Sequence, residues 1–290
     1  MKPMLAFSKR NILIYFRDKA SIFYSIFSVL ITFGVYLLFL SGSYLGDVPE
    51  EFKTYIQYMQ DEWLMAGLLA MTSFSTVFNS MGLLPFDKRI KNVDDFYSSP
   101  ISRNGIAGGY IIASIVTGLL MSAITFVCTQ VFLKIRGGHL VSLSNYPVVF
   151  FYILVSLIFS SSLAFAIALY GKTPRSYSSS TNVLLSLLGF LTGIYIPIGY
   201  MSTFLQTAIK LFPISHIAAL LRQVFTEKSF ANNLIVMPKE WNTEIRTTLG
   251  IDLYAGQSYI APWKSMIFVL IVSVILFIIS VHKLEKNKEK

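Results

Sequence analysis

Residues 104–133 read NGIAGGYIIASIVTGLLMSAITFVCTQVFL, which is 30 consecutive positions without a charged side chain. A bilayer core about 30 Å thick needs roughly 20 apolar helical residues to cross it. Lipid offers no partner for backbone N–H and C=O groups, so such a stretch must form its hydrogen bonds internally, as a helix. Five further charge-free stretches reach or approach this length, at 20–46, 63–86, 140–171, 176–209 and 265–282. The sequence therefore predicts an all-α polytopic membrane protein with six transmembrane helices.

The composition favours one membrane domain without a soluble catalytic module. The chain of 290 residues is 54% hydrophobic and 13% charged, whereas a soluble domain carries about 25% charged residues. We expect a single domain over residues 1–290, with an inner loop at 86–104 and an outer region at 202–262. The predicted spans lie at about 22–45, 63–85, 105–133, 148–171, 182–201 and 264–282.

Basic residues predict the orientation of the chain in the membrane. With both termini cytoplasmic, the inner segments hold 15 Lys and Arg in 59 residues, and the outer segments hold 9 in 94. The positive-inside rule favours this multi-pass arrangement in the cell membrane. It also explains the net charge of +9 without a nucleic-acid partner. Trp63 and Trp263 stand at the starts of predicted spans, where indole rings favour the membrane interface.

Several functions are disfavoured by what the spans lack. Almost no ionisable residue lies in a span interior, and such residues mark proton relays, pumps and intramembrane enzymes. The three histidines show no metal-ligand spacing. Gly171-Lys172-Thr173 lacks the earlier glycine that a phosphate-binding loop requires. Cys128 has no intrachain partner and is expected to be a small buried apolar residue. We predict no catalytic, cofactor or metal site here, so uphill transport would need energy from another chain.

The inner loop 87–104, DKRIKNVDDFYSSPISRN, carries the first functional signal. Asn92 is a suitable helix N-cap, and the two acids that follow would complement the helix dipole. A short helix over 93–98 would lie along the inner surface and expose two aromatic side chains to a cleft on a cytoplasmic partner. A solvated loop is the alternative. The candidate contact residues are Val93, Asp94, Asp95, Phe96, Tyr97 and Ser98.

The segment 193–225, GIYIPIGYMSTFLQTAIKLFPISHIAALLRQVF, carries the second signal. Two prolines interrupt an apolar pattern with helical spacing, and Lys210 and Arg222 prevent either half from spanning. Two short re-entrant helices in the outer leaflet fit this pattern, because broken backbone at membrane depth must be buried by protein. A surface amphipathic pair is the alternative. The candidate outer-gate residues are Pro197, Phe204, Phe212, Pro213 and Arg222.

The N-terminal segment 2–19 is imperfectly amphipathic. Its apolar residues Leu5, Ile12 and Phe16 share one face, and Arg10 and Arg17 share another. We expect an interfacial helix in the inner headgroup layer before the first span.

Small residues are spaced for close packing between helices. Gly105 and Gly109 form a GxxxG pair with Gly118 further along the same helix, and Gly189 and Gly193 form another pair. Packing within the chain and a dimer contact both remain open.

Together, these features resemble the membrane subunit of ABC-2 type transporters over nearly the whole chain. The most specific parts are Asp94–Arg103 before a Gly-rich helix start, and the broken segment 197–222 before the last span. The resemblance implies that two such subunits, a second copy or a paralogue, pair above two separate ATPase subunits that hold ATP and Mg. Residues 93–98 together with Arg10 and Arg17 would contact the ATPase. Spans one, two and five would line the transport path.

We therefore predict the permease subunit of an ATP-driven exporter, which is not itself an enzyme. An apolar and aromatic path suits an amphipathic cargo such as a drug, an antimicrobial peptide or a lipid-like molecule. Export of a polysaccharide or teichoic-acid type polymer is the alternative within the family. A non-transporting membrane sensor or scaffold is the alternative outside it. Abundant Lys, Ser and Asn with little Arg is compatible with a bacterial source.

Overall fold

The computed structural model describes residues 2–19, 22, 23, 27, 31, 34, 50–92, 96, 101–171, 173–233, 239–256 and 258–286. These residues form helices and one antiparallel hairpin of two short strands. In chain order the elements are α1 (Lys2–Arg17), α3 (Glu50–Met81), α4 (Leu83–Arg89), α6 (Arg103–Arg136), η2 (Leu143–Asn145), α7 (Tyr146–Tyr170), α8 (Pro174–Leu191), η3 (Ile198–Tyr200), α9 (Thr203–Lys210), α10 (Pro213–Phe225), α11 (Glu227–Asn233), α12 (Lys239–Thr248), β1 (Tyr254–Ala255), β2 (Ser258–Tyr259) and α13 (Pro262–Lys286).

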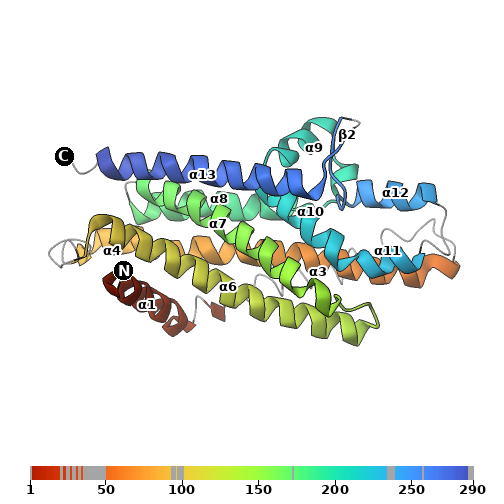
Figure 1. Cartoon of the computed structure of the whole chain (residues 1–290), viewed down its shortest axis with the longest axis horizontal. Coiled ribbons are helices and arrows are strands. Elements are labelled where there is room, and N and C mark those ends of the chain that lie inside the picture. Colours follow the sequence, from red (N-terminus) through yellow and green to blue (C-terminus); the bar gives the residue numbers. More distant parts are fainter. Residues whose placement is uncertain are drawn as a thin grey trace.

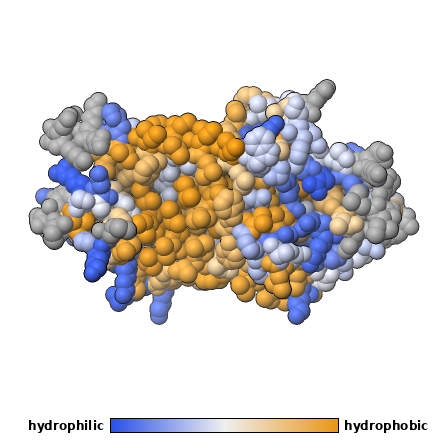
Figure 2. Space-filling view, viewed as in Figure 1, coloured by the Kyte–Doolittle hydropathy of each residue, from blue (hydrophilic) through white to orange (hydrophobic). Residues whose placement is uncertain are grey.

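The long helices run side by side along the longest axis of the molecule (Figure 1). One end holds α1, α4 and the C-terminal end of α13, and we call it the terminal end. The other end holds α11 and α12, and we call it the cap end (Figure 1). On the face shown in Figure 2, a broad apolar band separates hydrophilic groups at the two ends. A band of this kind is the surface that a protein presents to the hydrocarbon core of a membrane.

The described residues contain four helices that are long and apolar enough to cross a membrane: Phe52–Arg89, Arg103–Arg136, Leu143–Tyr170 and Pro262–Leu284. The bent pair of α9 and α10 makes a fifth if it counts as one span. Most of the predicted first span, 22–45, lies outside the described residues. The fold is thus mainly helical with four or five candidate spans in the described part of the chain.

Three helices lie within a few residues of the predicted spans. These are α6, α7 and α13, which extend at most four residues beyond the predicted bounds. Local sequence sets their ends, because Pro147 lies in the first turn of α7 and Gly137 follows α6 with φ of 79°. Glycine adopts this left-handed conformation at no steric cost, which ends the helix.

The helix near the predicted fifth span differs from the expected 182–201. It begins earlier, because the Thr173 hydroxyl accepts a hydrogen bond from the Ser176 N–H at 3.1 Å and Pro174 occupies the first turn. It also ends earlier, at Leu191, since Gly193 has φ of 71°. The residues that follow form turns and η3 rather than a membrane helix.

The second predicted span, 63–85, is also revised by the structure. The helix α3 begins 13 residues earlier, at Glu50. Trp63 therefore lies inside α3 rather than at its start, and it is buried with 1% of its surface exposed. The prediction that Trp63 stands at the start of a span is therefore wrong. Trp263, at the start of α13, is exposed as expected.

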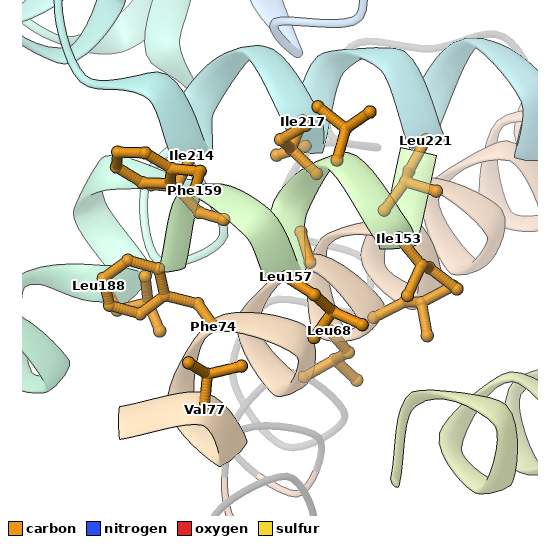
Figure 3. Packing of buried hydrophobic residues seen from close by; sticks show 14 of the residues in the cluster. Leu68, Phe74, Val77, Ile153, Leu157, Phe159, Leu188, Ile214, Ile217 and Leu221 are labelled. Carbon is orange, nitrogen blue, oxygen red and sulfur yellow. The ribbon is translucent and has the colours of Figure 1, made fainter. Parts of the chain in front are cut away.

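Four helices meet in the apolar core shown in Figure 3. Phe74 and Val77 come from α3, Leu157 from α7, and Ile217 and Leu221 from α10, while α8 contributes Leu188 (Figure 3). All six side chains are almost fully buried. Because α10 follows the break after α9, the core fixes the position of the broken segment against α3 and α7.

The small residues of α6 pack within the chain. A Cβ atom at Gly118 would lie 2.4 Å from Leu157 Cδ2 and 3.0 Å from Val77 Cγ2. At Gly109 it would lie 2.5 Å from Phe7 Cδ1 of α1. Another side of α6 is exposed and includes Cys128. The prediction that Cys128 is buried is therefore wrong. The cysteine lies on the side of α6 that carries other exposed apolar residues, because α6 lies at the edge of the bundle.

We expect Gly118→Ala to destabilise the protein by about 1–3 kcal/mol, since the added methyl group overpacks the contact between α6, α7 and α3. The measurement is the apparent melting temperature of the purified protein in mild detergent. Cys128→Ala is the matched control on the exposed side of α6 and should leave the melting temperature unchanged. Equal melting temperatures for both variants would contradict the packing role of Gly118.

Candidate functional site

At the terminal end, α1 packs on α6 through one face. The buried residues of α1 are Phe7, Ser8, Asn11 and Tyr15. The face predicted to be apolar is not the buried one, because Leu5 is 53% exposed. Its residues form a second apolar face that lies beside the buried face. One face of α1 thus packs against the protein. The second apolar face is exposed in the described structure, as suits a helix that lies in a headgroup layer.

An ion pair joins α1 to α4 at this end. Nη1 of Arg10 donates to Oδ2 of Asp87 at 2.8 Å, and Nη2 donates to Oδ1 at 3.2 Å. Tyr110 of α6 donates its hydroxyl to Oδ2 at 2.6 Å, and Asn92 donates to Oδ1 at 3.3 Å. The Asp87 side chain is 1% exposed and that of Arg10 is 31% exposed. Asp87 is therefore a buried carboxylate that three segments of the chain satisfy together.

Aromatic rings complete this group of residues. The ring of Phe96 lies 4.9 Å from that of Phe7, with the planes at 73°. The Arg10 guanidinium carbon lies 4.9 Å from the centre of the Phe96 ring, and the Phe7 ring lies 5.1 Å from that of Tyr110. We call these residues, Phe7, Arg10, Asp87, Phe96 and Tyr110, the Arg10–Asp87 cluster.

The cluster changes the interpretation of Phe96, which was predicted to be an exposed contact. It is half-buried against α1, because the ring finds an aromatic and a cationic partner inside its own chain. The other predicted contact residues, Val93, Asp94, Asp95, Tyr97 and Ser98, lie outside the described residues. Their role towards an ATPase stays a prediction.

The cluster favours the charged form of Arg10. Burial lowers the pKa of Arg10, but the hydrogen bonds and charge of Asp87 outweigh that effect, so its pKa is raised above the ordinary value. Arg17, the second predicted basic contact, lies in the last turn of α1 and is exposed. The structure therefore separates the two arginines, since one joins helices and the other faces outward.

Of the five predicted outer-gate residues, Phe212 and Pro213 lie at the break between α9 and α10, whereas Pro197 precedes η3, Phe204 lies in the first turn of α9 and Arg222 lies in the last turn of α10. The two helices are bent by 89° relative to each other, with Phe212 as the N-cap of α10 and Pro213 in its first turn. Phe212 is half-buried and its ring lies 6.0 Å from that of Phe159. Pro197 is buried, whereas Phe204 is 80% exposed. The break itself was predicted correctly, and the role of a gate stays a prediction.

Arg222 is the most unusual of these residues. It is completely buried, and among the described residues it has no carboxylate partner. Its guanidinium carbon lies 4.4 Å from the centre of the Trp63 ring, and Nη1 donates to the Leu249 carbonyl at 3.4 Å. Trp63 Nε1 donates to the same carbonyl at 2.7 Å. Nε and Nη2 of Arg222 have no hydrogen-bond partner among the described residues. Arg222 thus joins α10 to α3, and its expected role in keeping α10 from spanning stays a prediction.

The sequence reasoning missed two buried acids on α3. Asp61 and Glu62 lie just before the predicted second span, 63–85, where an outer loop was expected, yet they are 1% and 0% exposed. Arg136 Nε donates to Asp61 at 3.1 Å, and the His139 backbone N–H donates to Glu62 at 3.2 Å. Burial lowers the pKa of His139, and the charge of Lys228 lowers it further. The acids thus join α3 to the loop after α6.

The sequence contains one sign that Asp61 and Glu62 belong to a helix. Pro49-Glu50-Glu51 is a typical helix start, and it would have placed the acids inside a helix. Their partners are 75 and 77 residues away in the sequence. Nothing local in the sequence identifies such partners.

The fold, the apolar band and the candidate spans define a polytopic α-helical membrane protein. Residues 4–226 match the ABC-2 type transporter family, and the chain belongs to this family. A search of curated proteins found no match. The match covers most of α1, the Arg10–Asp87 cluster and the broken segment through Arg222, whereas Leu249 lies beyond it. Family membership implies a transport permease that works with an ABC ATPase in a membrane.

Proposed function

We propose that this chain is the permease subunit of an ATP-driven exporter that moves an amphipathic cargo. The observation that carries the proposal is the Arg10–Asp87 cluster, which connects α1, α4, α6 and the loop residue Phe96 at one end of the molecule. In this proposal the terminal end is cytoplasmic. ATP-driven closure of two ATPase subunits would push on the loop after α4 and on α1. The cluster would pass that displacement to α3 and α6 as one unit.

The exposed face of α8 supports an amphipathic cargo. It carries polar residues, Ser179, Asn182 and Ser186, beside the apolar residues Val183 and Leu187. The Asn182 amide would be unfavourable against lipid tails, whereas Ser186 donates its hydroxyl to the Asn182 carbonyl. We propose that this face lines the path, together with a second permease copy or a paralogue. Mixed polar and apolar groups would accept both parts of an amphipathic molecule.

Isolation of the complex tests the proposed function. The tagged chain would be purified from native membranes in mild detergent, and associated chains would be identified by mass spectrometry. We expect an ATPase chain with two nucleotide sites per complex, and ATP hydrolysis that amphipathic compounds stimulate more than polysaccharides do. Recovery of the chain without any ATPase in several mild detergents would contradict the proposal.

We expect the double variant Phe96→Ala and Tyr97→Ala to uncouple ATP hydrolysis from transport. Loss of the Phe7 and Arg10 contacts to Phe96 removes about 1–2 kcal/mol of aromatic and cation–π interaction. Cargo-stimulated hydrolysis should fall about tenfold, which corresponds to roughly 1.4 kcal/mol, while the ATPase still co-purifies. Phe151→Ala, on an exposed face of α7, is the matched control. Unchanged stimulation in the double variant would exclude the loop from coupling.

A further inference from the structure

A pocket of about 550 Å³ lies between α4, at the terminal end, and the start of α8 (Figure 1). Its lining residues come from α4 and from the segment that leads from α7 into α8. Pockets that bind small molecules measure roughly 300–1,000 Å³. The space is therefore large enough for a whole polar group and not only for an ion.

This pocket is lined by basic side chains from two helices. Lys88 and Arg89 belong to the last turn of α4, and Arg175 belongs to the first turn of α8. None of the described residues that line the pocket is acidic. In the part of the chain that the structure describes, the three side chains form no ion pair and no hydrogen bond. A cleft lined by charges of one sign concentrates counter-ions, so the lining selects an anion.

The helix α13 brings a fourth positive charge to this region. Nζ of Lys283 lies 5.3 Å from the centre of the Tyr170 ring. Tyr170 directly precedes Gly171, which lines the pocket. Three helices that are distant in the sequence, α4, α8 and α13, thus bring basic groups to one place.

Large apolar side chains accompany the basic ones. Phe86 and Ile90 flank the two basic residues of α4 in the sequence and are 49% and 47% exposed, and Tyr170 is 55% exposed. Hydrophilic groups border the apolar band at the terminal end (Figure 2). Basic pockets beside membrane helices bind anionic lipid headgroups. A free phosphate ion would use the basic side chains alone, whereas a lipid also uses the apolar surface next to them.

We propose that this pocket binds the headgroup phosphate of an anionic phospholipid. The phosphate oxygens accept charge-assisted hydrogen bonds from Lys88, Arg89 and Arg175, and the acyl chains lie along the apolar band. The bound lipid joins α4 to α8. The site is separate from the Arg10–Asp87 cluster and does not depend on the permease role, because binding requires neither an ATPase nor a cargo.

Native mass spectrometry of the purified full chain tests the site, because it counts the lipids that each chain retains. The probes are dioleoylphosphatidylglycerol and dioleoylphosphatidylcholine, which share their acyl chains and differ in net charge, and inorganic phosphate, which lacks the chains. We expect the first phosphatidylglycerol to bind at least tenfold more tightly than phosphatidylcholine, and inorganic phosphate to bind at least a hundredfold more weakly than phosphatidylglycerol. Equal affinity for the two lipids would overturn the proposal, and so would inorganic phosphate that binds as tightly as phosphatidylglycerol.

Two double variants with the same loss of charge locate the bound lipid. Lys88→Gln with Arg175→Gln should weaken phosphatidylglycerol binding at least tenfold, since two charge-assisted contacts are lost. Lys2→Gln with Lys9→Gln changes two exposed residues of α1 at the same end and should bind phosphatidylglycerol like the parent protein. Both double variants should keep the melting temperature that the parent protein has without added lipid. Equal weakening in the two double variants would show a general attraction of the terminal end for anions and would overturn the assignment to this pocket.

Discussion

Asp87→Ala is expected to lower the stability of this protein by about 3–5 kcal/mol, the usual loss when one partner of a buried ion pair is removed. The carboxylate accepts hydrogen bonds from Arg10, Tyr110 and Asn92, so a single change leaves three donors without their acceptor. The apparent melting temperature in detergent should fall by roughly 6–10 °C. Cargo-stimulated ATP hydrolysis should be lost as well, because α1 is no longer fixed to α4.

A double-mutant cycle separates the ion pair from the rest of the cluster. Arg10→Ala should cost less than Asp87→Ala, since the Arg10 side chain is 31% exposed and Asp87 is 1% exposed. The two changes combined should cost less than their sum, by about 1–3 kcal/mol, as expected for residues in direct contact. Strictly additive losses would show that the two side chains do not interact in solution.

The sequence predicted those parts of the fold that local chemistry determines. Long charge-free stretches identified α6, α7 and α13, because the need for internal hydrogen bonds in lipid leaves few alternatives. The break before α10 was predicted from Pro213, and the structure places a bend of 89° there. The contact of Phe96 with α1 of its own chain was not predicted, and the role of the loop after α4 towards an ATPase stays a prediction.

The predictions that failed depend on contacts between distant segments. Trp63 was placed at the start of a span because a charge-free stretch begins there, yet it lies inside α3 and contacts Leu249 and Arg222 in the fold. The fifth span was extended to 201 because residues 176–209 lack charge. Charge alone does not reveal that Gly193 adopts a left-handed conformation, which ends the helix at Leu191.

Arg222 raises the question of why a membrane protein keeps a buried guanidinium that no carboxylate of the described residues accompanies. Desolvation of a lone charge is costly, and replacement of buried ionic groups by apolar residues of similar volume is often neutral or stabilising. The Trp63 ring returns about 2 kcal/mol or more by cation–π attraction, which is less than the several kcal/mol that desolvation of the charge costs. Stability therefore does not explain this residue, and we expect its contact with Trp63 to matter instead for a movement of α10 against α3 in the proposed transport cycle.

Arg222→Met is accordingly expected to fold and to assemble with its ATPase, with a melting temperature equal to or above that of the parent protein. Cargo-stimulated hydrolysis should nevertheless fall at least tenfold, because α10 loses its polar contact with the Leu249 carbonyl and the Trp63 ring. Arg222→Ala, by contrast, should destabilise by about 2–5 kcal/mol, since it leaves a cavity.

The control is Arg246→Met, which removes an ordinary ion pair with Asp252. That change should lower stability modestly and spare stimulation. If Arg222→Met instead melts well below the parent protein, the buried charge is a structural requirement, and the role of Arg222 in movement is excluded.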